Sequence, residues 1–121
     1  MVIKSATQVP YFTKHFDGGN FSHRLILPGR DASRVKVTQF TGRVGTKFEN
    51  VHSPTDETVY LIEGRVKITN SEGIYEIEAG GVYYIPAGEV FSLEFLRLSE
   101  GLCVYSQAAD GTLPENEPDP D

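Results

Sequence analysis

Short segments of alternating polarity, separated by turn-forming residues, occupy the middle of the chain and constrain its fold more than any other feature. Between residues 21 and 107, Gly, Pro and Asn recur between runs that are rich in Val, Ile, Tyr and Phe. Residues 35–40 alternate with a period of two, which is typical of a strand, and no helical period persists over three turns. We therefore predict an all-β fold of about nine strands with little helix, arranged as a barrel or a sandwich.

The expected strands lie between these turn signals. They span residues 21–27, 35–40, 47–52, 57–63, 66–69, 74–78, 82–85, 90–98 and 102–107. The sequence Asn-Ser-Glu-Gly at 70–73 is typical of a hairpin turn. Residues 1–20 carry an apolar patch and end in the turn signal Asp-Gly-Gly-Asn, so we expect a capping segment or an edge strand there.

Acidic residues are concentrated at the C-terminal end. The chain of 121 residues has a net charge of −6, and five of its acids, Asp110, Glu115, Glu117, Asp119 and Asp121, follow residue 109 without a base among them. Removing these five leaves 12 acids against 11 Lys and Arg, so the body is nearly neutral. We expect one domain, with an N-terminal segment at 1–20, a barrel at 21–109 and a disordered acidic tail at 110–121.

Several function classes lack the signals that they require. No basic stripe is present to bind phosphates, which argues against nucleic acid as a partner. The N-terminus lacks the apolar run of a signal peptide, and no segment approaches the roughly 20 apolar residues of a membrane span. We therefore expect a cytoplasmic protein that does not associate with a membrane. The one cysteine, Cys103, lies in an apolar run and is expected to be a buried thiol. Nucleophile-elbow, phosphate-loop and Cys-x-x-Cys motifs are absent, which argues against nicotinamide or flavin chemistry.

The stretch 45–95 holds the candidate site. Asn50, His52 and Glu57 precede a strand that ends at Gly64, so hairpins here present one imidazole and one carboxylate on neighbouring strands. This stretch resembles the first motif of the cupin superfamily, a group of small jelly-roll β-barrels. That motif runs glycine, His-x-His, a glutamate three or four residues later, six residues and a glycine. Glu57 and Gly64 have this spacing, His52 stands at the second histidine position, and Asn50 stands at the first.

A second segment resembles the other cupin motif, in which a glycine, five residues, Pro-x-Gly and two further residues precede a histidine. Gly80, Pro86 and Gly88 match, and Phe91 stands at the histidine position. Within the superfamily, residues 56–64 and 85–88 are similar to the ethanolamine-utilisation and ureidoglycine-type cupins. The resemblance implies a cupin-type jelly-roll barrel with a degenerate metal site.

The resemblance also implies a metal held by three histidines and one glutamate, ligands that suit Fe, Mn, Ni or Zn. His52 and Glu57 are retained, Asn50 is a weak ligand and Phe91 is none, whereas catalytic zinc sites normally use three protein ligands. We therefore expect no cofactor, and we expect His52 and Glu57 as ligands if a divalent metal binds. His15 or His23 could complete such a site, although surface or capping positions are favoured for both.

In the cupin register, Asn50, His52 and Glu57 point into the barrel, because residues i and i+2 of a strand share a face. We predict that a small polar metabolite binds there. His52 and Glu57 would move protons in a lyase, isomerase or cyclase reaction, with Asn50 as the donor to an oxyanion. The expected substrate-binding residues are Asn50, Tyr84, Phe91 and Lys47.

Two alternatives to this function stay open. One is a non-catalytic ligand-binding or accessory cupin, and the other is a metal-dependent cupin enzyme whose incomplete motif is completed from elsewhere in the chain. A homodimer is expected in each case, because open barrel edges and an aromatic N-terminal segment invite a partner.

Overall fold

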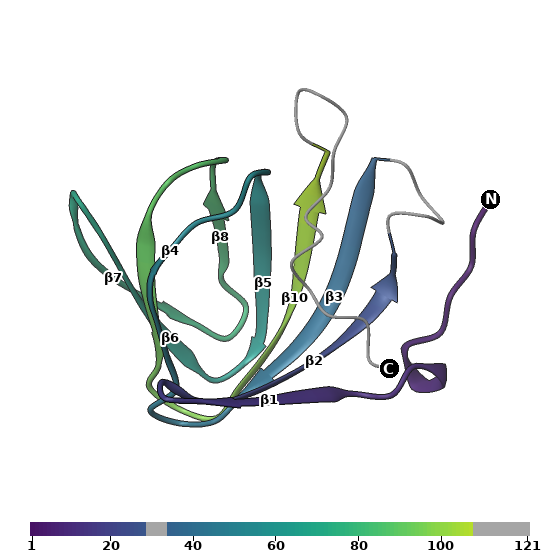
Figure 1. Cartoon of the computed structure of the whole chain (residues 1–121), viewed down its shortest axis with the longest axis horizontal. Helices are drawn as coiled ribbons and strands as arrows, with labels where there is room; N and C mark the ends of the chain where they lie inside the picture. The colour runs from purple at the N-terminus through teal and green to yellow at the C-terminus, as the bar shows by residue number, and fades with distance from the viewer. Residues whose placement is uncertain (29–33, 108–121) are drawn as a thin grey trace.

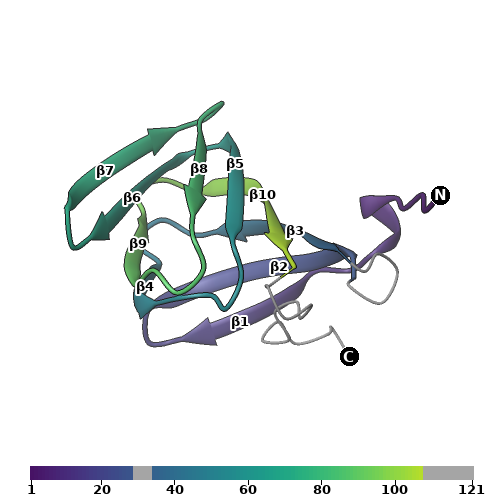
Figure 2. The ribbon, with the colours of Figure 1, turned by 90° about the horizontal axis from the view of Figure 1, so that it is seen from above.

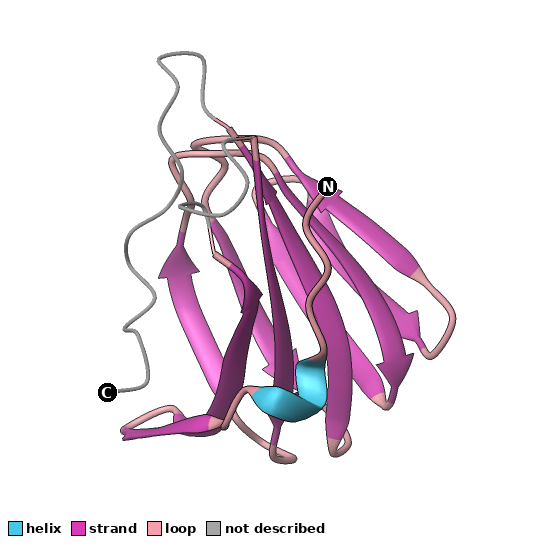
Figure 3. Ribbon diagram, turned by 90° about the vertical axis from the view of Figure 1, so that its right-hand side faces the viewer, coloured by secondary structure: helices cyan, strands magenta, loops and turns pink. Residues whose placement is uncertain are grey.

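The computed structural model describes residues 1–28 and 34–107, most of which lie in strands (Figure 3). The elements are the short 3-10 helix η1 (Ala6–Gln8) and the strands β1 (Phe12–Phe16), β2 (Gly19–Leu27), β3 (Val35–Gly42), β4 (Lys47–Val51), β5 (Glu57–Glu63), β6 (Arg65–Asn70), β7 (Gly73–Glu78), β8 (Val82–Ile85), β9 (Phe91–Phe95) and β10 (Ser99–Ser106). The all-β prediction is confirmed. The described residues form ten strands rather than about nine, because part of the N-terminal segment forms the edge strand β1.

The strands form two antiparallel sheets. One has six strands in the order β1-β2-β3-β10-β5-β8, and the other has four in the order β4-β9-β6-β7. From β3 onward the chain passes repeatedly from one sheet to the other, and among the described strands after β3 only β6 and β7 are consecutive neighbours within one sheet (Figures 1 and 2). This arrangement buries one face of each sheet, which is why the sequence shows a period of two.

The core lies between the two inner faces. In β3 every second residue is buried, and β9 follows the same alternation. The buried apolar residues are Phe40, Val59, Leu61, Val66, Ile68, Ile85, Phe91, Leu93, Phe95 and Cys103. Four phenylalanine rings meet at one end of the core: Phe21 lies 5.8 Å from Phe40 and 6.1 Å from Phe95 between ring centroids, and Phe48 packs edge-on against both Phe21 and Phe95.

Gly64 makes the tight connection between β5 and β6. Its φ is +100°, and a Cβ added there would lie 2.2 Å from the Ser99 hydroxyl oxygen and 2.6 Å from the Leu98 carbonyl oxygen. A side chain would therefore be strained both by the backbone conformation and by lack of space. This glycine is the one that closes the first of the two motifs in the sequence.

Two further expectations concern the C-terminal tail and the membrane. The predicted acidic tail at 110–121 lies outside the described residues, as do residues 108 and 109 of the expected barrel. Within residues 1–28 and 34–107, no helix is long and apolar enough to span a membrane.

Candidate active site

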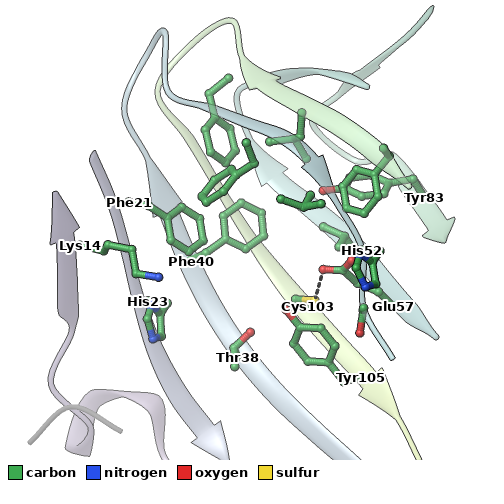
Figure 4. Close-up of a pocket in the computed structure, with 17 residues that line it drawn as sticks. Lys14, Phe21, His23, Thr38, Phe40, His52, Glu57, Tyr83, Cys103 and Tyr105 are labelled. Carbon is green, nitrogen blue, oxygen red and sulfur yellow. Dashed lines mark hydrogen bonds between the residues drawn. The ribbon is translucent and has the colours of Figure 1, made fainter. Parts of the chain in front are cut away.

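A cavity of about 300 Å³ lies between the sheets, and 17 residues line it, most of them from strands of the two sheets (Figure 4). Most of the lining is apolar and includes the four packed phenylalanines of the core. Polar side chains stand on two sides: Glu57, Tyr83, Cys103 and His52 on one, Lys14, His23 and Thr38 on the other (Figure 4). The volume is at the lower end of the range that binds small molecules in proteins.

Glu57 begins β5, and its side chain faces the cavity. The Cys103 thiol on β10 donates a hydrogen bond to Glu57 Oε1 at a sulfur–oxygen distance of 3.3 Å. The two side chains meet because β5 and β10 are neighbouring strands, with Cys103 paired to Val59, which shares its face of β5 with Glu57. Cys103 is buried as expected, and its thiol also holds the carboxylate in place.

Tyr83 on β8 brings a phenol to the same side of the cavity. Burial raises the pKa of Tyr83 well above its usual value of 10.0, and the nearby Glu57 and Cys103 raise this pKa further. The hydroxyl is therefore protonated at neutral pH and is available as a hydrogen-bond donor. A neutral donor that faces a largely apolar cavity beside a carboxylate is suited to stabilise an oxyanion.

His52 follows directly after β4 and lines the cavity together with Ser53. Its side chain is exposed, whereas Phe91 on β9, the neighbouring strand of the same sheet, is 93% covered and also lines the cavity. His52, Glu57 and Phe91 thus lie where the sequence placed them, at the cavity. Their roles in binding or catalysis remain predictions.

Asn50 and Lys47, both expected to bind substrate, do not line this cavity, and the expected position of Asn50 inside the barrel is wrong. Both line a separate depression with Lys67 and Glu94 on the other face of the four-stranded sheet. Lys47 lies there by ordinary alternation with the cavity-lining Phe48, whereas a β-bulge displaces Asn50: two residues of β4 separate Phe48 from Val51, and Ser92 alone separates their partners on β9. The extra residue breaks the i, i+2 rule, and Asn50 takes a φ of 51° and points away from the cavity.

Tyr84 also lies outside the cavity, and its neighbour Tyr83 forms the wall instead. In β8, Tyr83 pairs with the buried Val59, and Tyr84 pairs with Thr58 on the opposite face. The Tyr84 hydroxyl donates a hydrogen bond of 2.6 Å to Asp56, and the Ala87 N–H donates a second one of 2.9 Å. These two bonds lower the pKa of Asp56, and the bond to Asp56 raises the pKa of Tyr84.

His23 and Lys14 also line the cavity, and the sequence did not place them there. His23 on β2 is buried, not a surface or capping residue, whereas His15 is exposed and donates a hydrogen bond to the Asn20 side chain. The pattern Phe21-x-His23 in a strand places both rings on one face, and this was the available signal. It pointed to the interior but not to the cavity, because the sequence does not show which strands face each other.

A family comparison agrees with this geometry. The family model described as the EutQ-like cupin domain matches residues 31–101, more than half of the chain. The chain belongs to this cupin family. Membership confirms the resemblance to the cupins, including the ethanolamine-utilisation type, that the two motifs indicated.

Solved cupin structures share the fold. Ectoine synthase from P. lautus superposes with a TM-score of 0.77 at 21% identity, over 92% of this chain and 81% of that chain. The polyketide cyclase RemF from Streptomyces resistomycificus gives 0.73 at 18% identity, over 94% and 82%. The EutQ protein from Clostridium difficile gives 0.68 at 17% identity, over 89% and 82%. At these identities the likeness shows the fold alone, and no curated protein sequence matches the chain.

The donor set of this EutQ-like cupin does not fit the metal that the cupin resemblance implies. Within the described part of the chain, no three His, Cys, Asp or Glu side chains are grouped so that they could hold a metal ion. Phe91, at the position of the motif histidine, fills its place with an apolar ring, and Asn50 has turned to the other face.

Proposed function

We propose that this cupin binds a small carbonyl compound and transfers a proton at the carbon next to the carbonyl, as in a lyase, isomerase or cyclase reaction. One observation carries the proposal: a carboxylate, Glu57, and a neutral phenol, Tyr83, face the same largely apolar cavity. Proton transfer of this kind needs a base for the carbon-bound proton and a donor for the oxygen that becomes negative. The cavity supplies both.

In the proposed step, a Glu57 oxygen takes the proton, and the electron pair of the broken C–H bond forms the carbon–carbon double bond of an enolate. The enolate oxygen accepts a hydrogen bond from Tyr83, which takes the role that the sequence assigned to Asn50. For a substrate with a β,γ double bond, return of the proton from Glu57 to the γ-carbon of the resulting dienolate completes an isomerisation; for a substrate with a leaving group on the β-carbon, loss of that group completes an elimination. The exposed imidazole of His52 exchanges protons between the cavity and solvent.

Two of the structurally similar cupins carry names that agree with this class of chemistry, a synthase and a cyclase. The proposal does not extend to their substrates. A non-catalytic ligand-binding cupin is the alternative, and catalysed proton exchange distinguishes the two functions.

Exchange of carbon-bound protons in D₂O tests the proposal without knowledge of the natural substrate. We would follow the α-protons of levulinate and its longer acetyl-terminated homologues by proton NMR, with and without the protein. Glu57→Gln should lower the protein-catalysed rate by about a hundredfold or more, the usual contribution of a positioned base, and Tyr83→Phe should lower it by a smaller factor.

The matched control is Asn50→Gly, which keeps the positive φ and lies outside the cavity. Its exchange rate should equal that of the wild type. Exchange that persists in Glu57→Gln would refute the role of the carboxylate, and binding without any catalysed exchange would favour the non-catalytic alternative.

A further inference from the structure

His23 is a buried imidazole whose polar atoms are unsatisfied. The side chain is 4% exposed, and neither Nδ1 nor Nε2 has a hydrogen-bond partner among the described residues. It lines the cavity from β2, on the side away from Glu57 (Figure 4). A buried donor or acceptor without a partner destabilises a fold appreciably, so a group inside the cavity that bonds to this ring would be bound favourably.

The neighbours of His23 hold its ring in place without satisfying it. Phe12 on β1 and Phe21 on β2 lie 5.7 and 5.9 Å from it between ring centroids. Neither phenylalanine ring has a conventional hydrogen-bonding atom, so the two His23 nitrogens can form hydrogen bonds only with a group that enters the cavity. An apolar slot with one fixed polar group is typical of a ligand-orienting contact.

Lys14 adds a positive charge to the same place. In the β1–β2 pairing, Phe12 lies opposite His23 and Lys14 lies opposite Phe21, so Lys14 and His23 are diagonal neighbours on one face. Figure 4 shows the Lys14 amine extending toward His23. Among the described residues that line the cavity, Lys14 is the one Lys or Arg, and Glu57 is the one Asp or Glu.

The cavity therefore has a basic end and an acidic end. Strands β3 and β10 separate β2 from β5 in the sheet. Three interstrand spacings correspond to about 14 Å between the two backbones along the sheet. A ligand that reaches both ends needs an anionic group, a spacer of several carbon atoms and a reacting centre at the far end.

We propose that Lys14 and His23 form a subsite for the carboxylate of the substrate, and that the substrate class is a small linear oxo acid whose carbonyl lies at Glu57 and Tyr83. The inference deepens the proposed function and rests on it for the position of the carbonyl. The carboxylate accepts hydrogen bonds from the Lys14 ammonium and from an N–H of His23, and such charge-assisted bonds are stronger than neutral ones.

Paired probes test the subsite directly. Levulinate and its next two longer acetyl-terminated homologues would be titrated against the protein, each beside its primary amide, which keeps the shape and removes the charge. At least one acid of the series should bind about tenfold more tightly than its amide, and it should shift the ring-nitrogen signals of His23 in an NMR spectrum of the imidazoles.

Three variants separate the outcomes. His23→Phe keeps a ring between Phe12 and Phe21, and Lys14→Met keeps the length of the side chain; each should remove most of the preference for the acid. Lys67→Met on the opposite face of the other sheet is the matched control and should retain it. His23→Phe should also raise the melting temperature of the ligand-free protein, because it removes unsatisfied buried atoms.

The proposal is wrong if acid and amide bind equally, if no member of either series binds, or if His23→Phe retains the preference. The Glu57→Gln variant distinguishes failure of the carboxylate subsite from failure of the proposed function. That variant should lose proton exchange and retain the preference for the acid. Exchange that survives in Glu57→Gln, with the acid preference intact, would refute the catalytic role and leave the subsite in place.

Discussion

Gly42, the last residue of β3, allows the phenylalanine cluster of the core to pack, and its replacement is a sharp test of the fold around the cavity. A Cβ added to Gly42 would lie 2.2, 2.4 and 2.7 Å from three atoms of the Phe95 ring. Phe95 is 1% exposed and packs against Phe21, Phe40 and Phe48, so its ring can move only by losing these contacts or by entering the cavity. Gly42→Ala therefore overpacks the core.

Overpacking of this kind lowers the free energy of unfolding by about 1–3 kcal/mol. For a domain of this size, each kcal/mol corresponds to roughly 4 °C or more in the melting temperature. We expect Gly42→Ala to lower the melting temperature by at least about 4 °C in calorimetry, with a matching decrease in the urea midpoint. Phe95 also lines the cavity, so ligand affinity should fall as well.

Gly73→Ala is the matched control, since it adds the same methyl group to a strand residue. The nearest atom to its added Cβ is the Tyr75 hydroxyl oxygen at 3.6 Å, an ordinary contact, and Gly73 has no positive φ. Its stability should change by no more than about 0.5 kcal/mol. Equal stability of the Gly42→Ala and Gly73→Ala proteins would refute the packing argument.

Two further predictions concern ionisation and metals. Tyr84→Phe should raise the pKa of Asp56 toward its usual 3.8, because the Tyr84 hydrogen bond is the main cause of the lowering, and NMR titration of the carboxyl carbon measures this. A carboxyl group whose pKa is lower in the folded than in the unfolded protein stabilises the fold above the unfolded-state pKa, and this stabilisation is lost as the pH falls. The wild type should therefore lose more stability than Tyr84→Phe as the pH falls below about 4. An unchanged Asp56 pKa in Tyr84→Phe would contradict the role of this hydrogen bond. Elemental analysis of protein purified without chelator should find iron, manganese, nickel and zinc well below one equivalent, and near-stoichiometric metal that disappears in His52→Ala would contradict this.

The positions of the strands could be predicted because they depend on local chemistry. Glycine at the positive φ of the β5–β6 turn and the alternation of β3 are features of a few consecutive residues, and both are visible in the sequence. Glu57, His52 and Phe91 could be placed at the site for the same reason, since the motif spacing is local. In the structure all three line the cavity, and their roles stay predictions.

The facing of side chains was predicted less well, because a single-residue change in register reverses it. The bulge in β4 places Asn50 on the outer face of its sheet. In β8, side chains alternate between the two faces, so the expectation of Tyr84 in the cavity wall was wrong by one residue, and Tyr83 forms the wall. The buried Ile85, which shares a face with Tyr83, is the residue from which the correct alternation could have been read.

The sequence by itself determined an all-β cupin with a carboxylate and an imidazole at one site, because turns, strand periods and motif spacings act over a few residues. Only the tertiary structure decided that Tyr83 and Cys103 stand beside Glu57, and that His23 and Lys14 line the same cavity. These residues come from β1, β2, β8 and β10, which are brought together by sheet order rather than by sequence separation. The pairing of strands that are distant in sequence depends on the simultaneous burial of both inner faces, and a local sequence pattern does not predict which strands pair.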